Sequence, residues 1–223
     1  MTEVDLAREG IGMTSQRTRN RLLQKLRDLG IQNETVLSVM GRTPRHLFLE
    51  PAIAHRAYED QSLPIGYGQT ISRPYTVARM TELLLGSRST LKNVLEIGTG
   101  CGYQSAVLSP FTVQLSSVER IEALHQRAAR QLKELGYQNI ELTLSDGGWG
   151  WADKGPFDGI LAAASPETVP QALKDQLADG GRLILPVGKD KQVLTLVVRD
   201  GDEFHTEVVE DALFVPFLPG VQR

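Results

Sequence analysis

A glycine-rich turn directly after an apolar strand is the feature that most constrains what this chain can fold into. The strand covers Val94–Ile97, and the turn has the spacing Gly98-x-Gly100-x-Gly102. A second predicted strand ends at Glu119, 21 residues after Gly98. Glycines let the backbone turn sharply and approach a ligand closely, and an acid at the end of the next strand can accept hydrogen bonds from ribose hydroxyls. The spacing therefore predicts a nucleoside-binding βαβ unit.

The glycine spacing differs from the dinucleotide fingerprint G-x-G-x-x-G, whose third glycine lets the helix pack beside a pyrophosphate. Here Glu96, near the end of the strand, places a negative charge beside the loop. That charge repels a pyrophosphate and attracts an ammonium group. S-adenosylmethionine carries an ammonium, a sulfonium and a ribose but no phosphate. The loop resembles motif I of the class I methyltransferases, which implies S-adenosylmethionine as the cofactor.

Composition limits the remaining function classes. At 223 residues the chain suits one α/β domain and is too short for two full domains. A net charge of −3 and a pI near 5.8 argue against nucleic-acid binding, and we interpret the basic residues within 17–27 as the solvated face of an amphipathic helix. The lone cysteine, Cys101, excludes an intramolecular disulfide, and the four histidines are too scattered for a metal site, so we expect no metal.

The sequence also suggests where the protein is found. No apolar run reaches transmembrane length, and the first residues are acidic where a signal peptide needs basic ones. We therefore expect a cytoplasmic protein with no membrane partner, present as a monomer or a weak homo-oligomer.

Periodicity predicts two N-terminal helices followed by a doubly wound core. Leucines at helical spacing predict a helix that ends at Gly30, and Asn33 is the expected N-cap of the next helix. From Tyr103 onward helix and strand alternate, which predicts an α/β fold of Rossmann-like type with a mostly parallel sheet. Pro170 is expected to begin a helix that runs to Gly180. The last strands, over 193–199 and 204–209, are expected to close one edge of the sheet in antiparallel fashion.

We divide this single domain, 1–223, into five parts. Residues 1–13 lack periodicity and are expected to be flexible. The segment 63–75 contains two prolines and two glycines, and we expect a long irregular loop that binds substrate. The other parts are an N-terminal helical extension over 14–62, a cofactor-binding core over 76–190 and C-terminal strands over 191–223.

The segment Leu63–Tyr75 upstream of the glycine turn is similar to the protein-L-isoaspartate (D-aspartate) O-methyltransferase family. Its specific element is Gln69-Thr70-Ile71-Ser72. The similarity extends from about Thr14 to about Leu218 and includes Ser117–Arg120, Ser145–Gly147, Pro156–Asp158, Gly180–Gly188 and Phe214–Phe217.

This resemblance implies methyl transfer from S-adenosylmethionine to the carboxylate of isoaspartyl residues in damaged proteins and peptides, which begins their repair. The active-site serine of the family falls on Ser72. The resemblance further implies the following contacts: Glu119 with the ribose, Asp146 and Gly147 with the adenine, Gly98 and Gly100 with the methionyl end, and Thr70, Ile71, Ser72 and Arg73 with the substrate.

The chemistry of the residues agrees with this assignment. A sulfonium is already activated, so methyl transfer mainly needs alignment and exclusion of water. The substrate carboxylate is ionised at neutral pH and needs donors, not a base, so we expect Ser72 to orient it. Local chemistry alone favours Ser72 as a turn residue, and Trp149 and Trp151 as packing residues. Arg73, Ser145 and Ala163 depart from common family residues, and we hypothesise that Arg73 holds the isoaspartyl carboxylate or acidic flanking residues.

Several alternatives remain open. A class I methyltransferase with another acceptor would keep the glycine turn and Glu119. A serine hydrolase would use Ser72, although the chain has no G-x-S-x-G elbow. A cofactor-binding sensor without turnover and an NAD-linked oxidoreductase are further alternatives. The sequence leaves open whether D-aspartyl residues are accepted, and whether Phe214–Leu218 pairs at a sheet edge or flanks the substrate cleft.

Overall fold

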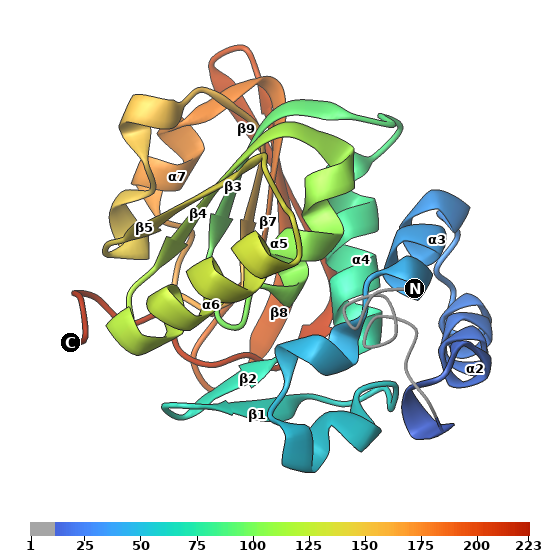
Figure 1. Ribbon diagram of the computed structural model, residues 1–223. Helices are drawn as coiled ribbons and strands as arrows, with labels where there is room; N and C mark the ends of the chain where they lie inside the picture. The colour runs from blue at the N-terminus through green and yellow to red at the C-terminus, as the bar shows by residue number, and fades with distance from the viewer. Residues whose placement is uncertain (1–11) are drawn as a thin grey trace. The chain divides into compact units, whose positions relative to one another are not determined.

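The structure is a computed structural model that describes residues 12–223, and the chain divides into two compact units, 1–82 and 83–223 (Figure 1). The expected flexibility of residues 1–13 falls mostly on positions outside the described residues. The N-terminal unit contains the elements η1 Gly12–Thr14, α2 Gln16–Asp28, α3 Glu34–Arg42, η2 Arg45–Phe48, η3 Pro51–Arg56, β1 Leu63–Gly66 and β2 Gln69–Ile71, and most of α4 Pro74–Leu85.

The two predicted N-terminal helices are confirmed. Helix α2 ends just before Gly30, and the Asn33 side chain caps α3 by accepting hydrogen bonds from the backbone of Thr35 and Val36. The solvated basic face of α2 is only partly as expected. Arg19 is buried, and its guanidinium lies 5.4 Å from the ring centroid of Tyr58. One side of the basic cluster therefore packs into the N-terminal unit.

The segment 63–75 is not the irregular loop that we expected. Strands β1 and β2 pair as an antiparallel hairpin, with Leu63 opposite Ile71 and Gly66 opposite Gln69. The two residues of the turn, Tyr67 and Gly68, have φ angles of 55° and 69°. Two consecutive left-handed residues suit the right-handed twist of a tight hairpin. The prediction failed because Tyr67 is not one of the residues that signal such a turn.

The C-terminal unit is built on a seven-stranded sheet with the order β5-β4-β3-β6-β7-β8-β9. Its elements are β3 Leu91–Ile97, α5 Tyr103–Leu108, η4 Ser109–Phe111, β4 Thr112–Glu119, α6 Glu122–Glu134, β5 Ile140–Leu144, η5 Gly147–Trp149, η6 Ala152–Lys154, β6 Phe157–Ala162, α7 Gln171–Asp175, β7 Leu177–Val187, β8 Gln192–Asp200 and β9 Glu203–Ala212.

The topology confirms the predicted doubly wound fold. Strands β3 to β7 pair in parallel, whereas β8 and β9 are antiparallel at one edge. From β3 the chain moves outward to β4 and β5, and it then returns to place β6 on the other side of β3. Right-handed crossovers in opposite directions put helices on both faces of the sheet. The strand order reverses between β3 and β6, and ligands bind at the carboxyl ends of strands at such a point.

The helix expected to run from Pro170 to Gly180 is much shorter. Helix α7 ends at Asp175, and β7 begins at Leu177. The pairing of β6 with β7 shifts register between Phe157↔Leu177 and Gly159↔Arg182, so β7 bulges over the residues between. Gly180 has a φ of 70°, and a Cβ at Gly181 would lie 2.7 Å from the Ala178 carbonyl oxygen. These glycines therefore serve a bulge and not a helix end.

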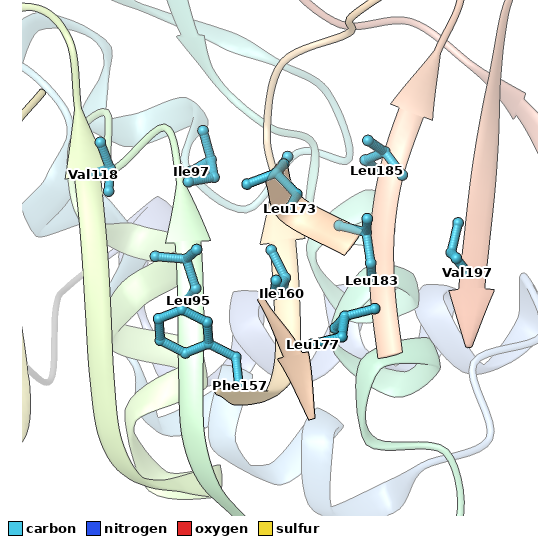
Figure 2. Packing of buried hydrophobic residues seen from close by; sticks show 11 residues of the cluster. Leu95, Ile97, Val118, Phe157, Ile160, Leu173, Leu177, Leu183, Leu185 and Val197 are labelled. Atoms are coloured by element: carbon cyan, nitrogen blue, oxygen red, sulfur yellow. The ribbon is translucent and has the colours of Figure 1, made fainter. Parts of the chain in front are cut away.

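A ladder of apolar side chains crosses the middle of the sheet. Leu95 of β3 pairs with Ile160 of β6, which pairs with Leu183 of β7, which pairs with Val197 of β8. All four side chains have zero exposure, and Figure 2 shows them in a row. Burial of each side chain contributes about 2 kcal/mol. This row fixes the positions of the strands whose carboxyl ends carry the candidate site.

Candidate functional site

The glycine turn after β3 adopts a conformation that requires glycine. Gly98, Gly100 and Gly102 have φ angles of 91°, 56° and 87°, so every second residue is left-handed. The residues between them, Thr99 and Cys101, are buried, whereas Gly98 and Gly100 are half-exposed. The turn therefore presents glycine backbone at the surface and anchors itself by the intervening side chains. The burial of Cys101 agrees with a small packing residue.

Glu119, at the end of β4, is joined to this turn. Its Oε2 accepts a hydrogen bond from the Gly100 backbone N–H at 2.8 Å, and its Oε1 accepts from the N–H groups of Arg120 and Ile121, both at 2.9 Å. The carboxylate is thereby held between the glycine turn and the loop that precedes α6. One lone pair of Oε2 remains for a further donor, such as a hydroxyl of a ligand.

Glu96 lies inside the fold. Its side chain has zero exposure, and its Oε2 accepts hydrogen bonds from the hydroxyls of Ser105 and Ser117. Burial raises the pKa of Glu96 to about 7; the two serine hydroxyls act in the opposite direction, and the nearby charge of Glu119 adds to the rise. The full negative charge that we expected beside the loop is therefore reduced at neutral pH, because removing a carboxylate from water favours its neutral form.

Asp146 and Gly147 follow β5, at the same edge of the sheet. Asp146 Oδ1 accepts from the Gly148 N–H at 2.8 Å, and its Oδ2 accepts from the Gly220 N–H at 2.6 Å. Gly147 leaves no room for a side chain, because a Cβ there would lie 2.3 Å from Ile97 Cγ2. The loop after β5 is thus packed against the end of β3.

The two tryptophans of this loop behave differently from one another. Trp151 is partly buried and packs against the central core cluster, as expected. Trp149 is 74% exposed, so the prediction that it packs the loop was wrong. The short helix η5 is followed by Gly150, which has a φ of 61°, and Gln176 donates a hydrogen bond to the Trp149 carbonyl oxygen. The backbone of Trp149 is held in this way while its ring remains at the surface.

The C-terminal tail supplies contacts that the sequence analysis missed. Val215 and Phe217 pair with Ser165, just after β6, through hydrogen bonds of 2.9 Å. Further along, Gly220 binds Asp146, and Gln222 pairs with the backbone on both sides of Ile121. The stretch that we left open therefore pairs beyond the end of β6. Only tertiary structure reveals these contacts, since nothing in the tail sequence points to Asp146.

The four predicted substrate residues belong to the N-terminal unit. Thr70 is exposed on β2, whereas Ile71 is buried. Ser72 is half-buried, and its hydroxyl has no hydrogen-bond partner among residues 12–223. Arg73 is exposed, donates to the Thr76 hydroxyl at 3.2 Å and stacks on the ring of Tyr75. The other six predicted site residues lie in the C-terminal unit, all at the carboxyl end of its sheet.

Two further features concern the whole described range. Within residues 12–223, the acids, histidines and cysteine form no group of three or more that can hold a metal ion. Over the same residues, no helix has the length and apolar character needed to cross a bilayer.

The chain is similar to known proteins along almost its entire length. A family model described as protein-L-isoaspartate(D-aspartate) O-methyltransferase (PCMT) matches residues 16–222. The protein-L-isoaspartate O-methyltransferase of Alcanivorax borkumensis is 56% identical over 221 residues, which are 99% of this chain and 100% of that protein. Protein-L-isoaspartate O-methyltransferase 1 of Marinobacter nauticus is 56% identical over 215 residues, 96% of this chain and 98% of that protein.

Solved structures agree on the fold. A structure named protein-L-isoaspartate O-methyltransferase has a TM-score of 0.80 at 25% identity. The match covers 92% of this chain and 67% of that chain. A Plasmodium falciparum structure in complex with S-adenosyl-L-homocysteine has a TM-score of 0.74 at 23% identity, over 90% of this chain and 98% of that one. The family match and the close relatives confirm the resemblance found in the sequence: the chain belongs to the protein-L-isoaspartate (D-aspartate) O-methyltransferase family.

Proposed function

We propose that this chain transfers the methyl group of S-adenosylmethionine to the side-chain carboxylate of L-isoaspartyl residues in damaged proteins and peptides, and so begins their repair. The observation that carries the proposal is the half-exposed backbone of Gly98 and Gly100, at the point where the strand order reverses, next to an acid that ends the neighbouring strand. Membership of the family supplies the substrate class.

The cofactor is assigned to the carboxyl end of the sheet. Gly98 and Gly100 would face the methionyl end, because their backbone can approach a ligand without a side chain between. Glu119 would accept a ribose hydroxyl on Oε2, where one lone pair is free of the Gly100 hydrogen bond. Asp146 and Gly147 would hold the adenine. Glu96 stays below the loop, with its side chain out of reach of solvent.

The transfer itself needs little acid or base chemistry. When bound, S-adenosylmethionine supplies an activated methyl group, so alignment and exclusion of water account for most of the rate enhancement. The isoaspartyl carboxylate is ionised at neutral pH and requires donors that orient one oxygen while the other faces the methyl group.

We assign that orienting task to Ser72. If Ser72 were only a turn residue, its hydroxyl would bond the local backbone, but it has no partner among residues 12–223. It is half-buried and lies between the buried Ile71 and the exposed Arg73. Such a hydroxyl can donate to a carboxylate at no cost to an existing hydrogen bond. Thr70, which is exposed on β2, would contact the flanking peptide together with the backbone of Ile71.

Arg73 would select for acidic residues near the isoaspartate. Its guanidinium lies 4.7 Å from the Tyr75 ring centroid, which holds the charge at the surface of the N-terminal unit. We expect Arg73→Gln to raise the KM for peptides with acidic flanks and to leave the KM for neutral peptides unchanged. If the variant has the same KM as the wild type for acidic peptides and for neutral peptides, Arg73 does not belong to the substrate site.

The deciding experiment compares matched peptides that differ only in Asp against isoAsp. The protein is incubated with methyl-labelled S-adenosylmethionine, and base-labile methyl ester is counted. Label on the isoAsp peptide alone supports the proposal, and Ser72→Ala should then lower kcat while S-adenosylhomocysteine binding is retained. Label on neither peptide, with S-adenosylhomocysteine still bound, would move the assignment to another methyl acceptor. A matched D-aspartyl peptide tests the second half of the family name.

The cellular setting belongs to the same proposal. A single cysteine, buried in the glycine turn, fits a reducing cytoplasm, where damaged cytoplasmic proteins would be the substrates. Localisation of a fluorescent fusion by microscopy tests this placement.

A further inference from the structure

We propose that Thr99, Ser117, Glu96 and Ser105 form a buried hydrogen-bond chain that fixes the glycine turn in its cofactor-binding shape. These four act as positioning residues and do not contact the ligand. The inference rests on the proposed function, because it takes the Gly98 and Gly100 backbone as the binding surface.

The register of the sheet places two of these residues together, and helix α5 adds a third. Glu96 of β3 pairs with Ser117 of β4 on one side and with Leu161 of β6 on the other. Paired residues point to the same face, and α5 brings Ser105 to that face. Glu96, Ser105 and Ser117 all have zero exposure. The chain is therefore sealed inside the C-terminal unit.

The hydrogen bonds have a defined direction. Ser117 Oγ donates to Glu96 Oε2 at 2.7 Å, and Ser105 Oγ donates to the same oxygen. Ser117 has only one hydroxyl proton, so Thr99 Oγ1, 2.6 Å from Ser117 Oγ, must be the donor in that pair. The order is thus Thr99 to Ser117 to Glu96, and it ends on a carboxyl oxygen that accepts twice.

The other carboxyl oxygen shows why this chain is sensitive to change. Glu96 Oε1 is buried and has no hydrogen-bond partner among the described residues. An ionised oxygen without donors is costly in the interior, which agrees with the raised pKa of Glu96. Ser117 and Ser105 are the groups that satisfy this carboxyl, so the loss of either hydroxyl leaves it further unsatisfied.

Thr99 transmits this anchoring to the binding surface. It lies between Gly98 and Gly100, is 3% exposed, and its side chain is held from below by Ser117. Glycine backbone is intrinsically free, so a turn with three left-handed glycines needs an external constraint to keep one shape. Glu119 supplies a second constraint from the rim through the Gly100 N–H. From the interior, the Gly98 and Thr99 N–H groups donate to the Val118 carbonyl oxygen, and the Thr99 hydroxyl adds a side-chain constraint.

The test measures binding of S-adenosylhomocysteine by calorimetry in Thr99→Val and Ser117→Ala. Each should weaken binding about tenfold, because each leaves a buried polar group without its partner. The double variant should bind S-adenosylhomocysteine no more weakly than the single variant with the lower affinity, since both changes break the same hydrogen bond. Thr99→Ser keeps the hydroxyl and should restore binding. The KM for the isoaspartyl peptide at saturating cofactor should not change.

The chain offers matched controls. Ser116→Ala removes a neighbouring hydroxyl that is equally buried but has no hydrogen-bond partner in the described structure. Thr195→Val makes the same change at a buried threonine on β8 whose hydroxyl, among residues 12–223, donates a hydrogen bond only to the Val193 carbonyl oxygen. Both should bind S-adenosylhomocysteine like the wild type.

The outcomes separate this inference from the proposed function. The hydrogen-bond chain would be overturned if Ser117→Ala bound S-adenosylhomocysteine with wild-type affinity. It would also be overturned if the losses of affinity in the two single variants multiplied in the double variant. Neither result would bear on the proposed enzyme activity. Failure of the wild type itself to bind S-adenosylhomocysteine would instead overturn the proposed function.

Discussion

Glu96→Gln should change how the stability of this protein depends on pH. The buried carboxyl has a pKa of about 7 in the folded chain, against an ordinary value of 4.5. The folded state therefore keeps a proton that the unfolded chain loses once the pH rises above 4.5. Stability falls with rising pH wherever the native state binds more protons. The contribution is present at low pH and is lost as the pH rises through about 7.

The size of the effect follows from the shift. A displacement of the Glu96 pKa from 4.5 to about 7 corresponds to about 3 kcal/mol in the free energy of unfolding. Gln does not titrate, so the variant should lack this slope. Its amide nitrogen at the position of Oε1 finds no acceptor among the described residues, which costs about 1–3 kcal/mol at every pH. We therefore expect the variant to be less stable than the wild type near pH 4.5, to gain on it as the pH rises to about 7, and to gain little more between pH 7 and pH 8.

Urea denaturation of both proteins at a series of pH values from 4.5 to 8 measures this difference, without cofactor. Other titrating groups contribute equally to both proteins and cancel in the difference of the two free energies. A difference that changes by less than about 0.5 kcal/mol over this range would show that Glu96 does not titrate there, and the argument from burial would fail.

Three further outcomes are expected from the same site. Glu119→Gln should weaken S-adenosylhomocysteine binding about tenfold in calorimetry, because one carboxylate oxygen that accepts backbone N–H groups becomes a donor. Gly147→Ala should destabilise the fold by about 1–3 kcal/mol in urea, with part of the loss recovered in an Ile97→Ala background, since the new methyl meets the Ile97 side chain. Deletion of residues 219–223, which are exposed, should leave the melting temperature nearly unchanged but weaken binding, because Asp146 loses the Gly220 N–H; unchanged affinity would show that the tail does not support Asp146.

The elements that the sequence predicted well have strong local signals. Strand β4 ends at Glu119, as predicted, and β6 lies in the region where helix and strand were predicted to alternate. Both are nearly continuous runs of buried residues, as expected in a parallel sheet covered on both faces. The Asn33 cap was equally clear because an Asx side chain at a helix start has a specific hydrogen-bonding function.

The wrong predictions concern glycines whose function depends on tertiary pairing. Gly180 was interpreted as a helix end, although it serves the bulge in β7. Gly66 and Gly68 suggested an irregular loop, although Gly66 precedes the tight turn of the β1–β2 hairpin and Gly68 is its second residue. A glycine signals only that the backbone leaves the usual regions of φ and ψ. It does not identify the partner strand that requires the departure.

The supporting residues of the glycine turn show where sequence reasoning ends. Ser116 and Ser117 are adjacent, chemically identical and both fully buried, so composition and burial cannot distinguish them. Only the register between β3 and β4 decides that Ser117 faces Glu96 while Ser116 pairs with Leu95 on the apolar face. A slip of one residue would place either Ser116 or Val118 opposite Glu96, so the register decides which hydroxyl, if any, reaches this carboxyl. The glycines and acids that we assign to the cofactor can be predicted from spacing along one chain segment, whereas the hydroxyls beneath them are specified by the pairing of two strands.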